Sequence, residues 1–154
     1  MGLAQHTRVE AVDGPAAIRE LVGKGMPVLT RLPSGGRGFR ILSKLTPSPE
    51  PVPVVRIALD NGQEATVGAD QVVYRTGFVA VRASDVRPGD VLEASFHYPA
   101  GYRVRDGSGA EGGRPEHVGL RVVAAEPAGA DVVYSGRVNE TGCLFLTCGI
   151  LCQL

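Results

Sequence analysis

The middle of the chain carries the feature that most constrains its fold, a hairpin signature. Two apolar and β-branched runs, Val54–Leu59 and Gln63–Val67, flank Asp60–Gly62, which reads Asp-Asn-Gly. Asn-Gly supplies the positive φ values that a tight turn between antiparallel strands requires. The sequence therefore predicts two paired strands here, and any fold for this chain has to contain them.

A second hairpin is expected further along, because Val72–Arg75 and Phe78–Arg82 flank Thr76 and Gly77 in the same way. The 21 glycines and 11 prolines, with few aromatic residues and no tryptophan, favour many short elements joined by turns. The predicted fold class is therefore mainly β. Further strands are expected at Met26–Arg31, Val91–Tyr98, Val118–Glu126, Val132–Asn139 and Leu144–Leu151.

Little helix is expected. Apolar residues repeat at helical spacing over Ala16–Val22, between Pro15 and Gly23, which predicts a short helix of about two turns. Ser84–Asp90 is predicted to form a helical turn or a tight loop. Residues 99–116 are rich in glycine and lack apolar periodicity, so a flexible surface loop is expected there.

A weak internal repeat relates Ala17–Leu29 to Ala80–Leu92. Each segment runs from a short helical turn through glycine into an apolar strand. An ancient duplication of a β unit would leave such a repeat.

Composition bounds the possible functions. The 154 residues, 44% of them apolar, suffice for one domain with a buried core, predicted over 1–154. Lys plus Arg equals Asp plus Glu at 16 each, so the overall charge predicts neither nucleic-acid binding nor membrane binding. Met1–Val12 lacks the apolar region of a signal peptide, so we expect a cytoplasmic protein with reduced thiols.

Several blocks in the first two thirds of the sequence match a known pattern. His6-Thr-Arg-Val9 and Asp13-Gly14 are similar to a Gly-Asp-Thr-x-Val strand and the Asp-Gly turn after it. Ile18–Gly23 is similar to Ile-x-Glu-Leu-Val-Gly, and Ala83–Leu92 to Ala-x-Asp-Leu-x-x-Gly-Asp-x-Leu.

The last third carries the most specific blocks. Val133–Val138 is similar to Val-Tyr-Asp-Leu-x-Val, and Thr147–Leu154 to Ala-Asn-Gly-Ile-Leu-Val-His-Asn. Taken in order, the blocks resemble the Hint family, which comprises inteins, bacterial intein-like domains and hedgehog autoprocessing domains. The resemblance implies a β horseshoe with pseudo-two-fold symmetry, one or two short helices and both chain ends at its centre.

The same resemblance assigns chemistry to particular positions, and this sequence departs from the family at each. Intein cleavage begins when a thiol or hydroxyl of the first residue attacks the preceding carbonyl. Counting back from Thr7 places that residue at Gly2, which has no side chain. The family's Thr-x-x-His, whose histidine protonates the leaving amide, corresponds to Gly68–Gln71. The amide of Gln71 cannot transfer a proton in the accessible pH range.

The residues that the resemblance assigns to the last step of splicing are also replaced. The aspartate of Val-Tyr-Asp is Ser135, which is too weak an acid to replace a carboxylate. The closing asparagine, whose carboxamide cyclises to release the C-terminal partner, is Leu154, and its assisting histidine is Gln153. Shifting the register by one residue would put the Gln153 amide in the cyclising place, but the Gly-Ile-Leu spacing argues against that shift.

The sequence therefore predicts a catalytically inactive intein-like domain without protein-splicing activity. We expect it to act as a binding or scaffold module for a protein or peptide partner, at the central cleft where an intein would hold its splice junctions, without a cofactor. One alternative is residual self-cleavage at a relocated cysteine. Another is a metal or redox site at Cys143, Cys148 and Cys152, with a fourth ligand from His6, His97 or His117.

The cysteine spacing lacks a Cys-x-x-Cys knuckle, which favours the simpler interpretation of small apolar fillers in a β core. Two basic groups are interpreted as solvated loop charge, because few aromatic residues are interleaved with them. These groups are Arg37, Arg40 and Lys44, and Arg103, Arg105 and Arg114.

Overall fold

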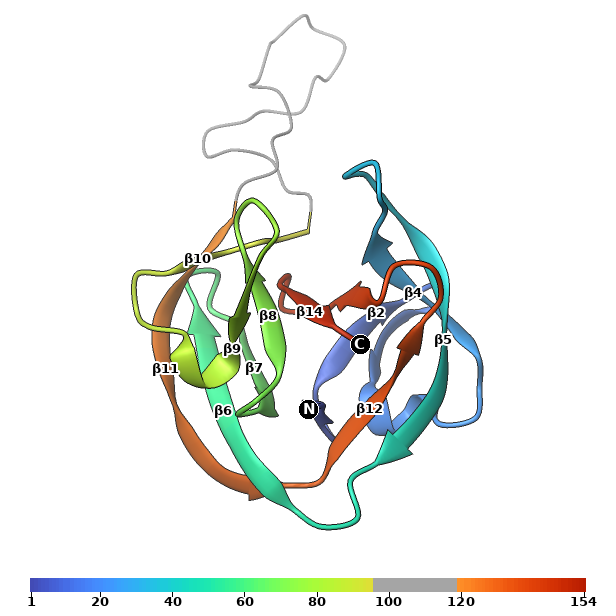
Figure 1. Cartoon of the computed structure of the whole chain (residues 1–154), viewed down its shortest axis with the longest axis horizontal. Helices are drawn as coiled ribbons and strands as arrows, with labels where there is room; N and C mark the ends of the chain where they lie inside the picture. The colour runs from blue at the N-terminus through green and yellow to red at the C-terminus, as the bar shows by residue number, and fades with distance from the viewer. Residues whose placement is uncertain (96–118) are drawn as a thin grey trace, which may run out of the picture.

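The computed structural model describes residues 1–95 and 119–154, and these residues form mainly short β-strands (Figure 1). The predicted mainly β class is confirmed. The loop predicted at about 99–116 lies outside the described residues, and a single domain over 1–154 stays a prediction. In the part of the chain that the structure describes, no helix has the length and apolar character needed to cross a membrane.

Two sets of elements follow each other in the same order. The first set is β1 (Leu3–Ala4), β2 (Arg8–Ala11), β3 (Gly14–Ala17), the 3-10 helix η1 (Ile18–Leu21), β4 (Met26–Arg31), β5 (Arg37–Pro47) and β6 (Val52–Leu59). The second set is β7 (Glu64–Gly68), β8 (Val72–Arg75), β9 (Val79–Arg82), the 3-10 helix η2 (Ala83–Asp85), β10 (Val91–Leu92), β11 (Leu120–Asp131) and β12 (Val133–Val138). A hairpin of β13 (Cys143–Phe145) and β14 (Leu151–Gln153) comes last.

The strand order shows that the two sets are related by pseudo-two-fold symmetry. From its edge to the centre, one half of the sheet runs β3-β2-β4-β5-β12-β1, and the other runs β9-β8-β10-β11-β6-β7. β1 and β7 meet at the axis, where Leu3 pairs with Val67. The repeat of Ala17–Leu29 in Ala80–Leu92 falls on equivalent elements, because each copy includes a 3-10 turn and the strand after it.

The predicted central hairpin is formed by β6 and β7, with Val54 opposite Gly68 and Ala58 opposite Glu64. Gly62 donates its N–H to the Leu59 carbonyl oxygen at 3.1 Å and has a φ of 80°. A three-residue loop of this kind needs one left-handed residue, and Gly62 supplies it. The second predicted hairpin is β8 with β9 and is also confirmed.

The helix predicted over Ala16–Val22 is wrong in extent. Ala16 and Ala17 belong to β3, which pairs with β2, and η1 is a single 3-10 turn. The pairing of Ala16 with Val9 uses backbone groups that a longer helix would have bonded internally, so tertiary pairing overrides local spacing.

The strand predicted over Leu144–Leu151 is a hairpin instead, formed by β13 and β14. Gly149, with a φ of 112°, lets the chain reverse, and Leu146 donates its N–H to the Ile150 carbonyl oxygen at 2.9 Å. β10 is shorter than the strand predicted over Val91–Tyr98, whose last three residues lie outside the described part.

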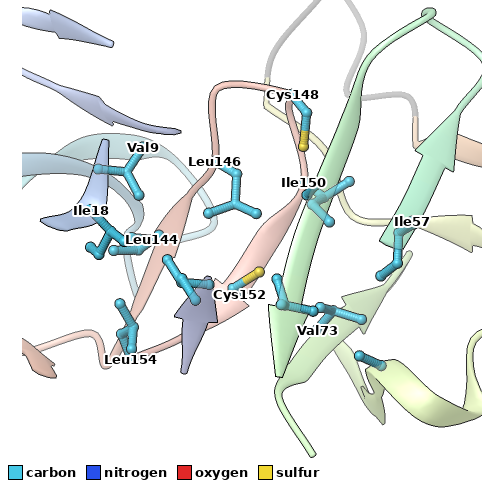
Figure 2. Close-up of a cluster of buried hydrophobic side chains, with 14 of the residues drawn as sticks. Val9, Ile18, Ile57, Val73, Leu144, Leu146, Cys148, Ile150, Cys152 and Leu154 are labelled. Carbon is cyan, nitrogen blue, oxygen red and sulfur yellow. The ribbon is translucent and has the colours of Figure 1, made fainter. Parts of the chain in front are cut away.

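The β13–β14 hairpin lies between the two halves and supplies the centre of the hydrophobic core (Figure 2). Leu146 forms a bridge to Val9 of the first half, and Ile150 forms one to Ala94 of the second. The hairpin is thus bonded to both halves. Figure 2 shows its apolar side chains between those of the two halves, among them Leu144, Leu146, Ile150, Cys152 and Leu154.

Candidate functional site

Gly2, the position assigned to the initiating nucleophile, lies directly before β1. This strand is enclosed by β7 and β12, and Gly68 donates its N–H to the Gly2 carbonyl oxygen at 2.8 Å. A Cβ added at Gly2 would stand 2.8 Å from the Tyr134 carbonyl oxygen and 3.0 Å from Cγ2 of Val133. Because the closest atom is backbone of the neighbouring strand, a serine or cysteine at position 2 would require β12 to move.

The Gly68–Gln71 turn lies beside Gly2. Gln71 donates its backbone N–H to the Gly68 carbonyl oxygen at 2.9 Å. A Cβ at Gly68 would lie 3.2 Å from Oδ1 of Asp70 and 3.3 Å from the Gly2 carbonyl oxygen. A threonine hydroxyl at Gly68 would therefore need its neighbours to give way.

Gln71 is fully buried and joins this turn to the C-terminal strand. Its Nε2 donates to the Gln153 carbonyl oxygen at 2.6 Å and to the Val72 carbonyl oxygen at 3.0 Å. Its Oε1 is buried without a hydrogen-bond partner among the described residues. A carboxamide in this setting holds two strands together, but it neither accepts nor releases a proton.

Leu154, in the place of the cyclising asparagine, is 7% exposed and belongs to the main hydrophobic core. Its N–H donates to the Gly142 carbonyl oxygen at 2.9 Å, and its carbonyl oxygen accepts from Val138 N–H at 3.3 Å. Gln153, which pairs with Cys143, is half-buried. The end of the chain is therefore fixed by packing and by backbone bonds.

Ser135 lies apart from this arrangement. It is exposed on β12, opposite Thr46 of β5. Six positions are matched to intein catalytic residues, and the structure joins five of these matched positions into one neighbourhood and leaves the hydroxyl of the sixth, Ser135, at the surface. The five are Gly2, Gly68, Gln71, Gln153 and Leu154. Sequence reasoning missed Tyr134, whose carbonyl limits the space at Gly2, because backbone crowding leaves no signal in residue type.

The three cysteines are buried and free. Burial raises the pKa of Cys148 to about 11 and that of Cys152 well above its usual value, so both remain thiols at neutral pH. Across residues 1–95 and 119–154, no group of three or more His, Cys, Asp or Glu residues is placed to hold a metal ion. His6 is exposed, and His97 and His117 lie outside the described residues.

The interpretation of Arg37 as solvated loop charge is wrong. Arg37 lies on β5, its guanidinium donates to the Ala94 carbonyl oxygen at 2.8 Å, and its Cζ lies 4.7 Å from the Phe145 ring centroid. Burial lowers its pKa. Arg40 pairs with Glu140 at 2.8 Å, and Arg103, Arg105 and Arg114 lie outside the described part.

Buried side chains of the β13–β14 hairpin lie at the centre of the horseshoe, where the sequence resemblance places a cleft for a partner. The described residues line four cavities of about 270, 290, 310 and 400 Å³, among others, and none of the six matched positions lines any of these four. The largest of the four lies between β6, η2 and β11. Any partner that binds at one of these four cavities therefore binds away from the matched positions.

No protein-family model matches the sequence, and no curated protein matches it. Solved structures do match. The DnaX mini intein from Spirulina platensis has a TM-score of 0.77 and 12% identity, with 100% of both chains covered. The bacterial intein-like domain from Clostridium thermocellum has a TM-score of 0.75 and 14% identity, with 99% of this chain and 98% of that chain covered.

The gp41-1 intein is also similar, with a TM-score of 0.72, 14% identity, and coverage of 99% of this chain and 98% of that chain. At these identities the likeness shows the fold. The chain has the Hint fold of inteins and intein-like domains, and the predicted β horseshoe is confirmed.

Proposed function

We propose that this chain is an intein-like domain without splicing activity that acts as a binding or scaffold module for a protein or peptide. The observation that carries the proposal is the absence of space at Gly2, where a Cβ would meet the Tyr134 carbonyl oxygen at 2.8 Å. One substitution at Gly2 could restore a nucleophilic side chain, but there would be no space for that side chain unless β12 also moved. This crowding favours a long-standing inactive state.

The surroundings of Gly2 support the same proposal. Splicing needs a group that transfers a proton to the leaving amide. The Nε2 of Gln71 only donates hydrogen bonds to backbone carbonyls and cannot transfer a proton. Release of the C-terminal partner needs a cyclising amide, and Leu154 packs in the core instead. The residues that match catalytic positions thus serve the stability of the sheet.

The binding part of the proposal concerns the outer surface. Because buried side chains of the β13–β14 hairpin lie at the centre, the surfaces for a partner are the outer faces and edges of the sheet. The partner is a protein or peptide rather than nucleic acid or a membrane, in keeping with equal numbers of acidic and basic residues, 16 of each. We place the protein in the cytoplasm.

Reporter domains fused to both ends test the inactive state. Intact mass measured over days should show only the full-length fusion, for the parent and for Gly2→Cys, because the added thiol lacks a proton donor and space. A matched fusion with a protease site at each junction shows that released fragments are detected. Fragment release from the parent would overturn the proposal.

Two alternatives are resolved with cysteine variants. If fragments do appear, their loss in Cys152→Ala, which removes the nucleophile altogether, identifies residual self-cleavage at a relocated cysteine. Metal analysis of purified protein, with Cys148→Ser as control, tests a metal site. Burial of both thiols in the core speaks against each alternative.

A further inference from the structure

Exposed sheet edges attract other strands, and the edges of this sheet differ in their protection. Among the described residues, β3 pairs only with β2, β9 only with β8, and β13 only with β14. All three residues of β13 are buried, so that edge is covered. The edges β3 and β9 are equivalent under the pseudo-two-fold symmetry, because each is the last strand of its half in the strand order.

The hydrogen-bond ladder shows which groups of β9 point outward. Ala83 donates its N–H to the Gln71 carbonyl oxygen at 2.8 Å, so Val81 and Val79 also direct their backbone groups at β8. Ala80 and Arg82 then direct their N–H and C=O groups away from β8. Within residues 1–95 and 119–154, no partner is found for these outward groups.

In the first half of the sheet, the equivalent edge strand β3 carries a proline at an outward-facing position. Ile18 donates its N–H to the Thr7 carbonyl oxygen at 2.9 Å, which is the equivalent of the bond from Ala83 to Gln71. Three residues before Ile18 stands Pro15, and three residues before Ala83 stands Ala80. Pro15 has no N–H, so β3 lacks one of the two outward donors that β9 keeps, the one at the position of Ala80.

β9 also exposes apolar side chains. Val79 is 53% exposed and Phe78, just before the strand, is 39% exposed. The strand Val79–Arg82 contains no proline, glycine or lysine, and Arg82 carries its one charge. An edge with free donors and exposed apolar residues is suited to pairing with another strand.

We propose that β9 pairs with β9 of a second copy of this chain, joining two sheets antiparallel about a two-fold axis at Val81. In this register Ala80 exchanges both backbone hydrogen bonds with Arg82 of the second copy, and Arg82 does so with its Ala80. Val81 faces Val81, and each arginine lies opposite a small residue.

The two neighbouring registers of β9 against β9 are less favourable, so the pairing about Val81 is the one expected. Placing Arg82 opposite Arg82 brings like charges together. Placing Ala80 opposite Ala80 requires Phe78 to continue the ladder, but its φ of 62° takes it out of the strand. A four-residue edge forms a small interface, so the dimer is weak and depends on concentration.

Sedimentation velocity over about a hundredfold range of concentration, reaching the millimolar level, tests the proposal. The weight-average mass should rise above the 16.1 kDa monomer as concentration increases. Ala80→Pro, which copies Pro15 and removes only an outward N–H, should remain monomeric, whereas Ala80→Val keeps the N–H and should associate like the parent. A parent that stays monomeric, or a dimer that survives Ala80→Pro, overturns the proposal.

Cysteine cross-linking tests the register and does not depend on the proline variant. Val81→Cys should form an intermolecular disulfide under mild oxidation, because residue 81 faces itself across the axis. Ala80→Cys is the matched control, since residue 80 faces Arg82. Equal cross-linking of the two variants, or none in Val81→Cys, would contradict the proposed pairing. Pairing of β9 with a strand of another protein would appear as a monomeric parent.

Discussion

At the scale of single residues, Gln71 shows what a glutamine contributes at the position that the sequence resemblance assigns to a histidine. Its amide donates to the backbone of β8, the strand that follows it, and of β14, at 3.0 and 2.6 Å. A neutral histidine has one N–H and a proton to exchange, whereas the glutamine amide has two N–H groups and none to exchange. A glutamine here therefore provides a hydrogen bond to β14 where a histidine would provide proton transfer.

Gln71→Leu should lower the free energy of unfolding by about 1–3 kcal/mol, because the part-buried Gln153 carbonyl oxygen loses its side-chain donor. Urea unfolding measures the change, and hydrogen exchange should show faster opening of β14. Gln63→Leu, at an exposed position, is the control and should change stability by less than about 0.5 kcal/mol. Equal effects of the two substitutions would show that the Gln71 hydrogen bonds contribute nothing.

The sequence resemblance singled out these positions because each residue type fails a chemical requirement, and their correspondence to catalytic positions stays a prediction. It did not reveal that Gln71 bonds to Gln153, because the two are far apart in sequence. Ser135 also shows that a sequence motif does not fix a position in space. The motif grouped Ser135 with the other five positions, although its side chain is exposed on β12.

At the scale of elements, the β13–β14 hairpin depends on Gly149. Its φ of 112° is accessible to glycine, and a Cβ there would lie 2.7 Å from Cδ1 of Leu120. Gly62 also has a positive φ, of 80°, but no atom lies within 4 Å of the place of its Cβ. Comparing Gly149 with Gly62 therefore distinguishes the cost of crowding around a Cβ from the cost of a left-handed backbone.

Gly149→Ala should therefore destabilise the protein more than Gly62→Ala. We expect about 1–2 kcal/mol for the left-handed backbone at Gly62, and about 1–3 kcal/mol more for crowding at Gly149. Thermal and urea unfolding of the two variants measure the difference. A smaller loss for Gly149→Ala would mean that Leu120 moves aside freely.

Element prediction succeeded where turn chemistry was explicit and failed where it was not. The β6–β7 and β8–β9 hairpins were predicted from Asn-Gly and Thr-Gly. β5 was not predicted, because arginine, glycine, serine and lysine interrupt its apolar pattern. The Leu144–Leu151 hairpin was predicted as one strand, because Gly149 is the only turn signal in an apolar run.

At the scale of the whole molecule, both halves share a core that contains two thiols, and this predicts how stability depends on pH. Burial raises the pKa of Cys148 from 9.0 to about 11, and that of Cys152 well above its usual value. The unfolded chain releases these protons near pH 9, while the folded chain keeps them. The stability they contribute is thus complete below pH 9 and decreases between pH 9 and about 11.

Over that interval Cys148 should cost roughly 2 kcal/mol of stability, because two pKa units correspond to that order of free energy. Urea unfolding at several pH values measures the decrease, which should be much smaller in the Cys148→Ala, Cys152→Ala double variant. A decrease of the same size in both proteins would assign the alkaline effect to other groups, such as Tyr74, whose pKa is also raised by burial.

The strand at the two-fold axis has a consequence for synthesis. β1 pairs with β12 through Leu3 and Tyr134, and the core between the halves is completed by residues near position 150. A ribosome makes the chain in the direction from β1 to β12, so β1 has to wait for one of its two neighbours until residues 133–138 are made. Folding of the sheet centre is therefore a late event, and translation speed sets how long an unpaired apolar strand stays open to other chains.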